Sequence, residues 1–270
     1  MRKEWRGFFA DFYMNILALG DVVGVQGCEF LRKKLPALKK LKGIDFCLAN
    51  GENSASGNGI TPESAKFLLD SGVDFITTGN HVYRRREIYD YLDESRFVIR
   101  PANYCAENPG KGTATVDLGR VRIGIINVLG NAFISNGVEN AFSCVEKALD
   151  EIRDCKIKLV DFHAEATGEK RAMGFLLNGK VTAVFGTHTH VQTADEQVLS
   201  EGTGYISDLG MTGPKDTVLG VDSSIVINAF RTAMPARFNV PDLPCIMCGC
   251  IFEVDDRTGK TVSVERICIA

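Results

Sequence analysis

The chain has 270 residues, of which 45% are hydrophobic, 24% charged and 9% aromatic. This composition is typical of a globular protein and excludes a disordered, collagen-like or coiled-coil chain. The formal net charge of −3 gives no electrostatic footprint for a general nucleic-acid binder, and no apolar run reaches the roughly 20 residues that span a bilayer. We therefore expect no membrane partner and no stable nucleic-acid complex.

The first thirteen residues, MRKEWRGFFADFY, precede a second methionine, Met14, and a strand-like segment. Their apolar part is interrupted by Asp11 and is not followed by a signal-cleavage site. We expect residues 1–13 to be an upstream extension or a start-site artefact. Residues 14–270 are then expected to form a single domain.

Short apolar segments alternate with helical patterns along most of the chain. The segments are rich in β-branched or aromatic residues and are bounded by Gly or polar residues, which predicts strands. Thr61 followed by Pro62 and Glu63 is typical of a helix start. This alternation favours βαβ units and a largely parallel sheet. In chain order, we expect strand 15–18, helix 29–41, strand 44–49, helix 62–71, strand 73–77, helix 85–92, strand 121–127, helix 138–153, strand 157–162 and strand 181–185.

The C-terminal part has a different pattern. Residues 245–254 and 261–269 are strand-like and flank a polar turn that contains Gly259. This arrangement predicts an antiparallel hairpin.

The nine cysteines are odd in number and mostly lack paired spacing, so we expect reduced thiols in a cytoplasm. Cys245, Cys248 and Cys250 form a denser C-x-x-C-x-C group within a strand-like segment. A zinc or redox site would need a fourth ligand or a helix start, and no histidine lies near. We interpret the three as small apolar strand residues.

Side chains that can bind metals or transfer protons follow five of the predicted strands, at the point where each strand ends. In open α/β sheets, ligands bind beyond the carboxyl ends of the strands. All four histidines of the chain belong to this set, which a random distribution would not produce. We therefore expect one site at this edge, formed from Asp21, Glu52, Asn53, Asn80, His81, His163, His188 and His190.

The types of these side chains restrict the metal. Imidazole, carboxylate and amide groups without thiolate suit manganese, iron, zinc or a mixed pair. The set exceeds the four ligands of one tetrahedral zinc, so two ions about 3.5–4 Å apart, bridged by Glu52, fit better. If the chain stays extended after its strand, alternation places His188 and His190 on one face.

Seven segments of the chain resemble the YmdB family of bacterial metallophosphoesterases, which belongs to the calcineurin-like superfamily. The resemblance runs from about Met14 to the final strand. It implies a four-layer α/β/β/α sandwich, a dinuclear centre, and phosphodiesterase activity on 2′,3′-cyclic nucleotides with weaker activity on other phosphoesters. The segments, in the family's order, are GDVVG (20–24), NGENSASGNGIT (50–61), TTGNH (77–81), RPAN (100–103), DFHAEATGEK (161–170), GTHTHVQTAD (186–195) and DLGMTGP (208–214).

The resemblance also implies a role for each site residue. The D-x-H motif that is common in the superfamily is absent, because Val23 stands where the histidine would be. The Glu52-Asn53 pair of the family takes its place. The implied ligands are Asp21, Asn53 and His190 for one ion and Asn80, His163 and His188 for the other, with Glu52 bridging and His81 protonating the leaving oxygen.

We therefore expect a cytoplasmic phosphodiesterase in which a metal-bridging hydroxide attacks phosphorus in line and His81 acts as general acid. Iron or manganese is the expected metal, with zinc and magnesium as alternatives. The expected substrate is a small phosphoester such as 2′,3′-cAMP. Two other functions stay open, a phosphomonoesterase such as a nucleotidase and a non-enzymatic regulator with a structural metal site. A homo-oligomer also stays open.

Overall fold

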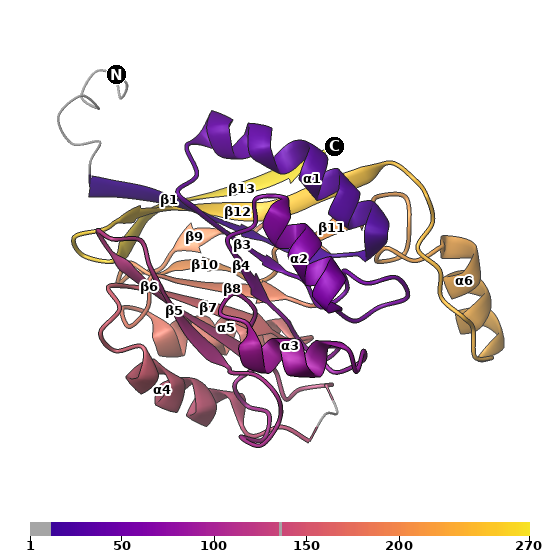
Figure 1. Cartoon of the computed structure of the whole chain (residues 1–270), viewed down its shortest axis with the longest axis horizontal. Coiled ribbons are helices and arrows are strands. Elements are labelled where there is room, and N and C mark those ends of the chain that lie inside the picture. Colours follow the sequence, from indigo (N-terminus) through magenta and orange to yellow (C-terminus); the bar gives the residue numbers. More distant parts are fainter. Residues whose placement is uncertain (1–11, 135–136) are drawn as a thin grey trace.

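The computed structural model describes residues 12–134 and 137–270 of the chain. Two β-sheets pack face to face, and helices cover their outer faces (Figure 1). Three apolar clusters fill the spaces between these layers: one between the sheets, one beneath α1 to α3 and one beneath α4 and α5. The four-layer α/β/β/α sandwich expected from the sequence is confirmed.

The first sheet has the strand order β2-β11-β12-β1-β3-β4, and β13 pairs with β12. β1, β3 and β4 are parallel to one another, whereas β12 is antiparallel to both β1 and β13. Its strands are β1 (Tyr13–Leu19), β2 (Asp21–Val22), β3 (Phe46–Asn50), β4 (Phe75–Thr77), β11 (Met211–Pro214), β12 (Cys245–Asp255) and β13 (Lys260–Ile269).

The second sheet has the order β5-β6-β7-β8-β10-β9, in which the four central strands are parallel and the two edge strands are antiparallel. The six strands expected in the alternating region do pair in parallel, but they divide between two sheets, and antiparallel strands complete each sheet. The strands are β5 (Thr113–Asp117), β6 (Arg122–Leu129), β7 (Ile157–His163), β8 (Ala183–Thr187), β9 (Gln197–Val198) and β10 (Gly204–Ile206).

Helices follow most of the parallel strands, and α2 begins at the cap expected from Thr61 and Pro62. In α2, the Thr61 hydroxyl accepts the N–H of Ser64 at 3.2 Å, and the Ser64 hydroxyl accepts the N–H of Thr61 at 3.0 Å. This reciprocal cap satisfies two backbone donors that the helix leaves free. The helices are α1 (Gly24–Lys42), α2 (Pro62–Asp70), α3 (Ile88–Glu94), α4 (Ala141–Glu151), α5 (Thr167–Leu177) and α6 (Ser223–Thr232).

α5 and α6 were not expected from the sequence. Two glycines, Gly168 and Gly174, lie within α5 and lower its helical propensity. Only Val226 of α6 is buried, and Ile227 and Phe230 are exposed, so this helix has no core-facing stripe of the usual width. Figure 1 shows α6 projecting from the body of the protein.

The start of β1 bears on the expected N-terminal boundary. Tyr13 pairs with Asp255 as the first residue of β1, and the Phe12 carbonyl accepts the N–H of Asp256 at 2.9 Å. Two of the thirteen residues therefore contact the β12–β13 hairpin. The rest of the expected extension, residues 1–11, lies outside the described residues.

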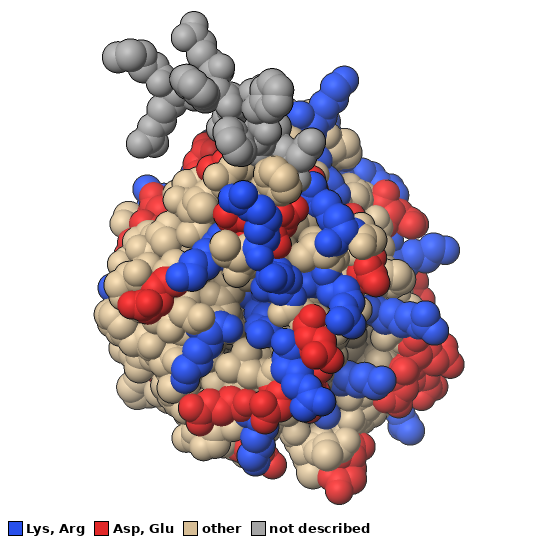
Figure 2. All heavy atoms as spheres, turned by 90° about the vertical axis from the view of Figure 1, so that its left-hand side faces the viewer, with Lys and Arg blue, Asp and Glu red and all other residues tan. Residues whose placement is uncertain are grey.

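Lys and Arg gather on the face that carries the β12–β13 turn (Figure 2). A cavity of about 360 Å³ beside this turn is lined by five basic and two acidic side chains. The chain therefore has a locally basic region although its formal net charge is −3. The charged residues lining the cavity are Arg153, Lys156, Lys158, Lys180, Lys260, Asp154 and Glu201.

Among the residues that the structure describes, no helix combines the length and apolarity needed to cross a bilayer.

Candidate metal centre

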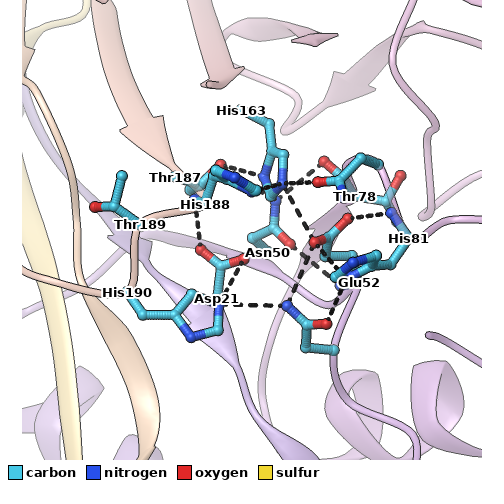
Figure 3. A network of polar contacts seen from close by, with 12 residues as sticks. Asp21, Asn50, Glu52, Thr78, His81, His163, Thr187, His188, Thr189 and His190 are labelled. Carbon is cyan, nitrogen blue, oxygen red and sulfur yellow. Dashed lines mark hydrogen bonds and ion pairs between the residues drawn. The ribbon is translucent and has the colours of Figure 1, made fainter. Parts of the chain in front are cut away.

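The eight predicted site residues meet at the carboxyl ends of β1, β3, β4, β7 and β8. Each lies within 3.6 Å of another member of the set, through contacts that join all eight into one network. Figure 3 shows Asp21 and His190 at one end of this network and Glu52 and His81 at the other.

Four donor atoms converge at the centre of the network. Nε2 of His163 lies 3.2 Å from Oε1 of Glu52, 3.1 Å from Nδ1 of His188 and 3.0 Å from Oδ1 of Asn80. The ligand atoms of Glu52, His163 and His188 all lie within 4.8 Å of one another, which is compact enough to surround one cation. The imidazole, carboxylate and amide groups are those that bind divalent transition metals.

A second group of donors surrounds Asp21. This carboxylate is buried, and its Oδ1 atom accepts no hydrogen bond from the described residues. Nε2 of His190 lies 3.6 Å from that oxygen. A buried carboxylate oxygen without a donor is unfavourable unless a cation compensates it, so this group fits a second metal ion.

Hydrogen bonds fix the proton on the outer nitrogen of two histidines. Nδ1 of His190 donates to the Leu219 carbonyl at 2.9 Å, which leaves the Nε2 lone pair facing Asp21. The Thr187 hydroxyl donates to Asp161 at 2.7 Å and accepts from Nδ1 of His163 at 2.8 Å. Such outer contacts orient metal-binding histidines and set their tautomer.

His188 is also held by an outer oxygen, but its outer nitrogen is Nε2 and its inner nitrogen is Nδ1. Its Nε2 lies 3.1 Å from the carboxylate of Glu165, which can only accept, so Nδ1 faces the centre. Burial and then the nearby His163 lower the pKa of His188 to about 4, which keeps its imidazole neutral at pH 7. A neutral imidazole is the form that binds metals.

The carboxylates stabilise positive charge at the centre. Burial lowers the pKa of His163, but Glu52, Asp21 and Asp161 together outweigh it and raise the pKa to about 9. Burial likewise raises the pKa of Glu52, but His163 and His81 hold it well below its usual range. The field that stabilises a proton on His163 would also stabilise a metal ion, so proton and metal compete for this position.

His81 lies beside the centre rather than within it. Its Nδ1 is 2.8 Å from Oδ1 of Asn53 and 3.1 Å from Oε1 of Glu52, and its backbone N–H donates to Oε2 of Glu52 at 2.8 Å. About one fifth of its side chain is exposed (20%). A partly exposed imidazole held at one nitrogen suits proton transfer at the other.

The amide of Asn53 presents nitrogen, not oxygen, to the candidate ligands. Its Nδ2 lies 3.3 Å from Oε1 of Glu52 and 3.4 Å from Nε2 of His190, while Oδ1 faces His81. Turning the amide over exchanges these two atoms without moving the rest of the side chain. Only the turned amide could offer oxygen to a metal ion.

One geometric expectation is wrong. β8 ends at Thr187, and the backbone of His188 and His190 is left-handed, with φ of 98° and 63°. Extended alternation therefore does not apply. The turn sends His188 toward His163 at the centre of the network and His190 toward Asp21 at one end.

Several supporting residues were not found from the sequence. Asp161 is buried within β7 and accepts hydrogen bonds from Thr77, Thr187 and Asn50 at 2.5, 2.7 and 3.2 Å. Burial is the main cause that raises the pKa of Asp161, to about 6. A carboxylate inside an apolar strand was the available signal, since an unpartnered charge is rare there.

The two-sheet sandwich described above is a fold that nucleotidase structures share. A 5′-nucleotidase structure from Staphylococcus aureus shares the fold, with a TM-score of 0.59 and 17% identity over 95% of this chain and 54% of that one. The YmdB-like protein family matches residues 17–267, and the chain belongs to this family.

Two relatives are similar over nearly their whole length. The 2′,3′-cyclic-nucleotide 2′-phosphodiesterase of Bacillus subtilis is 41% identical over 256 residues, which cover 95% of this chain and 97% of the relative. The crystal structure of a phosphatase from Mycoplasma pneumoniae has a TM-score of 0.90 and 34% identity, covering 95% and 93% of the two chains.

Proposed function

We propose that this protein is a metal-dependent phosphodiesterase that hydrolyses 2′,3′-cyclic nucleotides. The observation that carries the proposal is the orientation of three histidines: each has one ring nitrogen in contact with an outer oxygen and the other directed into the network, toward Glu52 for His163, Asp21 for His190 and His163 for His188. The name of the Bacillus subtilis relative supports the substrate class. The buried Asp21 oxygen without a hydrogen-bond donor supports the need for a cation.

The proposed ligands form two groups that share Glu52. Iron or manganese is the expected metal, with zinc and magnesium as alternatives, and imidazole, carboxylate and amide groups without thiolate suit manganese, iron or zinc. Bound metal ions would activate a water molecule and neutralise charge on the phosphate. The groups are Asp21, Asn53 and His190 for one ion, and Asn80, His163 and His188 for the other.

His81 is the proposed general acid for the departing ribose oxygen. If Asn53 turns its amide oxygen toward a metal ion, its Nδ2 faces Nδ1 of His81, and that nitrogen becomes an acceptor. The His81 proton then resides on Nε2, the nitrogen directed away from Asn53. Metal binding by Asn53 and the proton-donating form of His81 are thus linked through one amide group.

The expected partner is a small phosphoester, and no stable nucleic-acid complex is expected. The basic face seen in Figure 2 is the place to test that expectation, although Asp154 and Glu201 lie among its lysines.

The cytoplasm stays the expected compartment because all nine cysteines are free thiols. We also propose that residues 14–270 form a single domain.

Metal analysis combined with a substrate panel tests the function. Protein purified without chelator and reconstituted with manganese or iron should hold close to two ions per chain and should prefer 2′,3′-cAMP to 5′-AMP. A preference for 5′-AMP would identify a nucleotidase instead. Full metal content without hydrolysis of either compound would point to a regulator with a structural metal site.

A further inference from the structure

Two cysteines of the β12–β13 hairpin lie side by side on neighbouring strands. Cys248 and Cys268 are direct partners in the antiparallel register, and their sulfur atoms are 3.4 Å apart. Directly paired residues of antiparallel strands have Cα atoms about 4.5–5.5 Å apart, which lies within the roughly 4.4–6.8 Å that disulfides span. The backbone already has the separation that a disulfide needs.

The two thiols differ in access. Cys268 is exposed, whereas Cys248 is buried and donates a hydrogen bond to the Cys268 sulfur. Burial, and then the contact with Cys268, raise the pKa of Cys248 to about 12. The inner thiol keeps its proton, and the outer sulfur can meet an oxidant from solution. An exposed thiol next to a second cysteine is the arrangement of redox-sensitive pairs.

The other cysteines lack such a partner. Cys250 is buried in the apolar cluster between the sheets, as expected for a small strand residue. Cys105 is exposed, but its sulfur contacts the carboxylate of Glu107 rather than another thiol. Packing as a small apolar strand residue therefore accounts for Cys250, but it does not account for the contact of Cys248 with a second thiol.

We propose that Cys248 and Cys268 form a reversible intrachain disulfide, an oxidative modification site next to the metal centre. The oxidant is a low-molecular-weight disulfide. The Cys268 thiolate attacks one of its sulfurs and releases the first small thiol. Cys248 loses its proton, attacks the mixed disulfide at Cys268 and releases the second, so two protein thiols are oxidised and one small disulfide is reduced. The 3.4 Å separation makes the second step intramolecular.

The pair is connected to the metal centre through Gln192, which follows His190 by two residues. Nε2 of Gln192 donates to the carbonyls of Gly249 and Ile267 at 3.0 and 2.9 Å, and these residues are the sequence neighbours of Cys248 and Cys268. Closing the sulfurs from 3.4 Å to about 2 Å would cross-link the two strands that carry both carbonyls and restrict their motion at the Gln192 contact.

The backbone that carries Asp21 lies against the same pair. The N–H of Gly20 donates to the Cys248 carbonyl at 3.1 Å, and the N–H of Asp21 donates to the Gly210 carbonyl at 3.1 Å. A Cβ atom at Gly210 would lie 2.9 Å from the Cβ atoms of both Cys248 and Gln192, so these side chains flank Gly210 closely. We therefore expect disulfide formation to slow hydrolysis, a step that rests on the proposed function.

The test compares reduced protein with protein treated with glutathione disulfide, using manganese-loaded full-length chain. The oxidised chain should lose about 2 Da, should protect two cysteines from alkylation, and should yield one peptide linking Cys248 to Cys268. Dithiothreitol should reverse all three changes. Cys268→Ser should abolish the mass loss, the protection and the linked peptide. Cys105→Ser is the control, because it alters the other exposed cysteine, whose sulfur contacts Glu107, and it should leave all three changes intact.

Hydrolysis of 2′,3′-cAMP is the second readout. The rate should fall by about twofold or more on oxidation and recover on reduction. In Cys268→Ser, treatment with glutathione disulfide should leave the rate unchanged. Absence of the linked peptide, or a stable adduct at Cys268 that Cys248 never resolves, would overturn the proposed pair. An unchanged rate despite complete disulfide formation would overturn the connection to the centre. A reduced protein without activity would refute the proposed function, while the mass measurement would still test the pair.

Discussion

The ammonium group of Lys170 lies 2.6 Å from Oδ2 of Asp208, and both side chains are buried. The same oxygen accepts the N–H of Thr189 at 3.1 Å, and Oδ1 accepts the N–H of Gly210 at 2.8 Å. Thr189 lies between His188, which contacts His163, and His190, which contacts Asp21. This ion pair thus holds the turn that separates His188 from His190.

Lys170→Met should lower the free energy of unfolding by about 3–5 kcal/mol, because it leaves the Asp208 carboxylate buried without its partner. The double variant Lys170→Met/Asp208→Asn removes the unpaired charge and keeps an oxygen for one backbone donor, so it should recover part of the loss. Urea unfolding monitored by circular dichroism measures both. A loss below about 1 kcal/mol in the single variant would show that the pair does not hold the turn.

Thr187→Val should weaken metal binding by about 10–100-fold with little change in fold. The substitution removes the hydroxyl that connects His163 to Asp161 and keeps a β-branched side chain at the end of β8. Manganese affinity, measured by competition with a chelating dye, is the readout. Thr182→Val is the matched control. Its buried hydroxyl donates to the Gly259 carbonyl at 2.7 Å and takes no part in the network of the centre. Equal metal loss in both variants would contradict the proposed orienting role.

His81→Ala should leave the metal content unchanged and slow hydrolysis of a 2′,3′-cyclic nucleotide by roughly 10²–10⁴-fold. An ester with a nitrophenolate leaving group needs little protonation and should be affected much less. His163→Ala and His188→Ala should instead lose metal and slow both substrates alike.

Metal content and the two rates, measured on the same preparations, separate these cases. If His81→Ala loses a metal ion or slows both substrates equally, His81 is a ligand or a phosphate-binding group and not the acid.

Manganese affinity should rise with pH, by about tenfold per unit between pH 7 and 9, and then level off. The pKa of His163 is raised from 6.5 to about 9, so the metal must displace a proton anywhere below that pH. In metal-free protein, the stability that comes from the protonated His163 is present below pH 6.5 and is lost as the pH rises through about 9. Calorimetric titration in buffers of different ionisation enthalpy measures the released proton. An affinity independent of pH would contradict the competition.

A chain that starts at Phe12 should keep its fold and its metal, since residues 1–11 precede the first described strand. A chain that starts at Met14 should also fold, with a slightly lower thermal midpoint, because it lacks the Tyr13 pairing with Asp255 and the Phe12 carbonyl. Thermal unfolding and metal analysis compare the two. Aggregation or metal loss in the Phe12 chain would show that the N-terminal segment is structural.

The positions of eight strands were predictable because they depend on local patterns, whereas β2, β5, β9, β10 and β11 were not expected. The expected strands at 157–162 and 261–269 differ from β7 and β13 by one residue at one end. The helix expected at 85–92 is less accurate, since α3 begins only at Ile88 after a series of turns. Helix boundaries near a functional loop depend on contacts such as that of Arg85 with the Asn58 carbonyl, which no local pattern encodes.

The sequence by itself determined which residues form the candidate centre, because each follows a strand directly and strand ends can be read from apolar periodicity. It could not determine which partners orient them. Leu219 is 29 residues from His190, and Asp208 is 38 residues from Lys170. The left-handed turns at His188 and His190 bring residues that follow β8 of the second sheet toward Asp21 of the first, a contact that arises only when the two sheets pack together. The contact between Cys248 and Cys268 depends on the exact register of the β12–β13 pair. Such contacts depend on three-dimensional proximity, and sequence spacing carries no record of it.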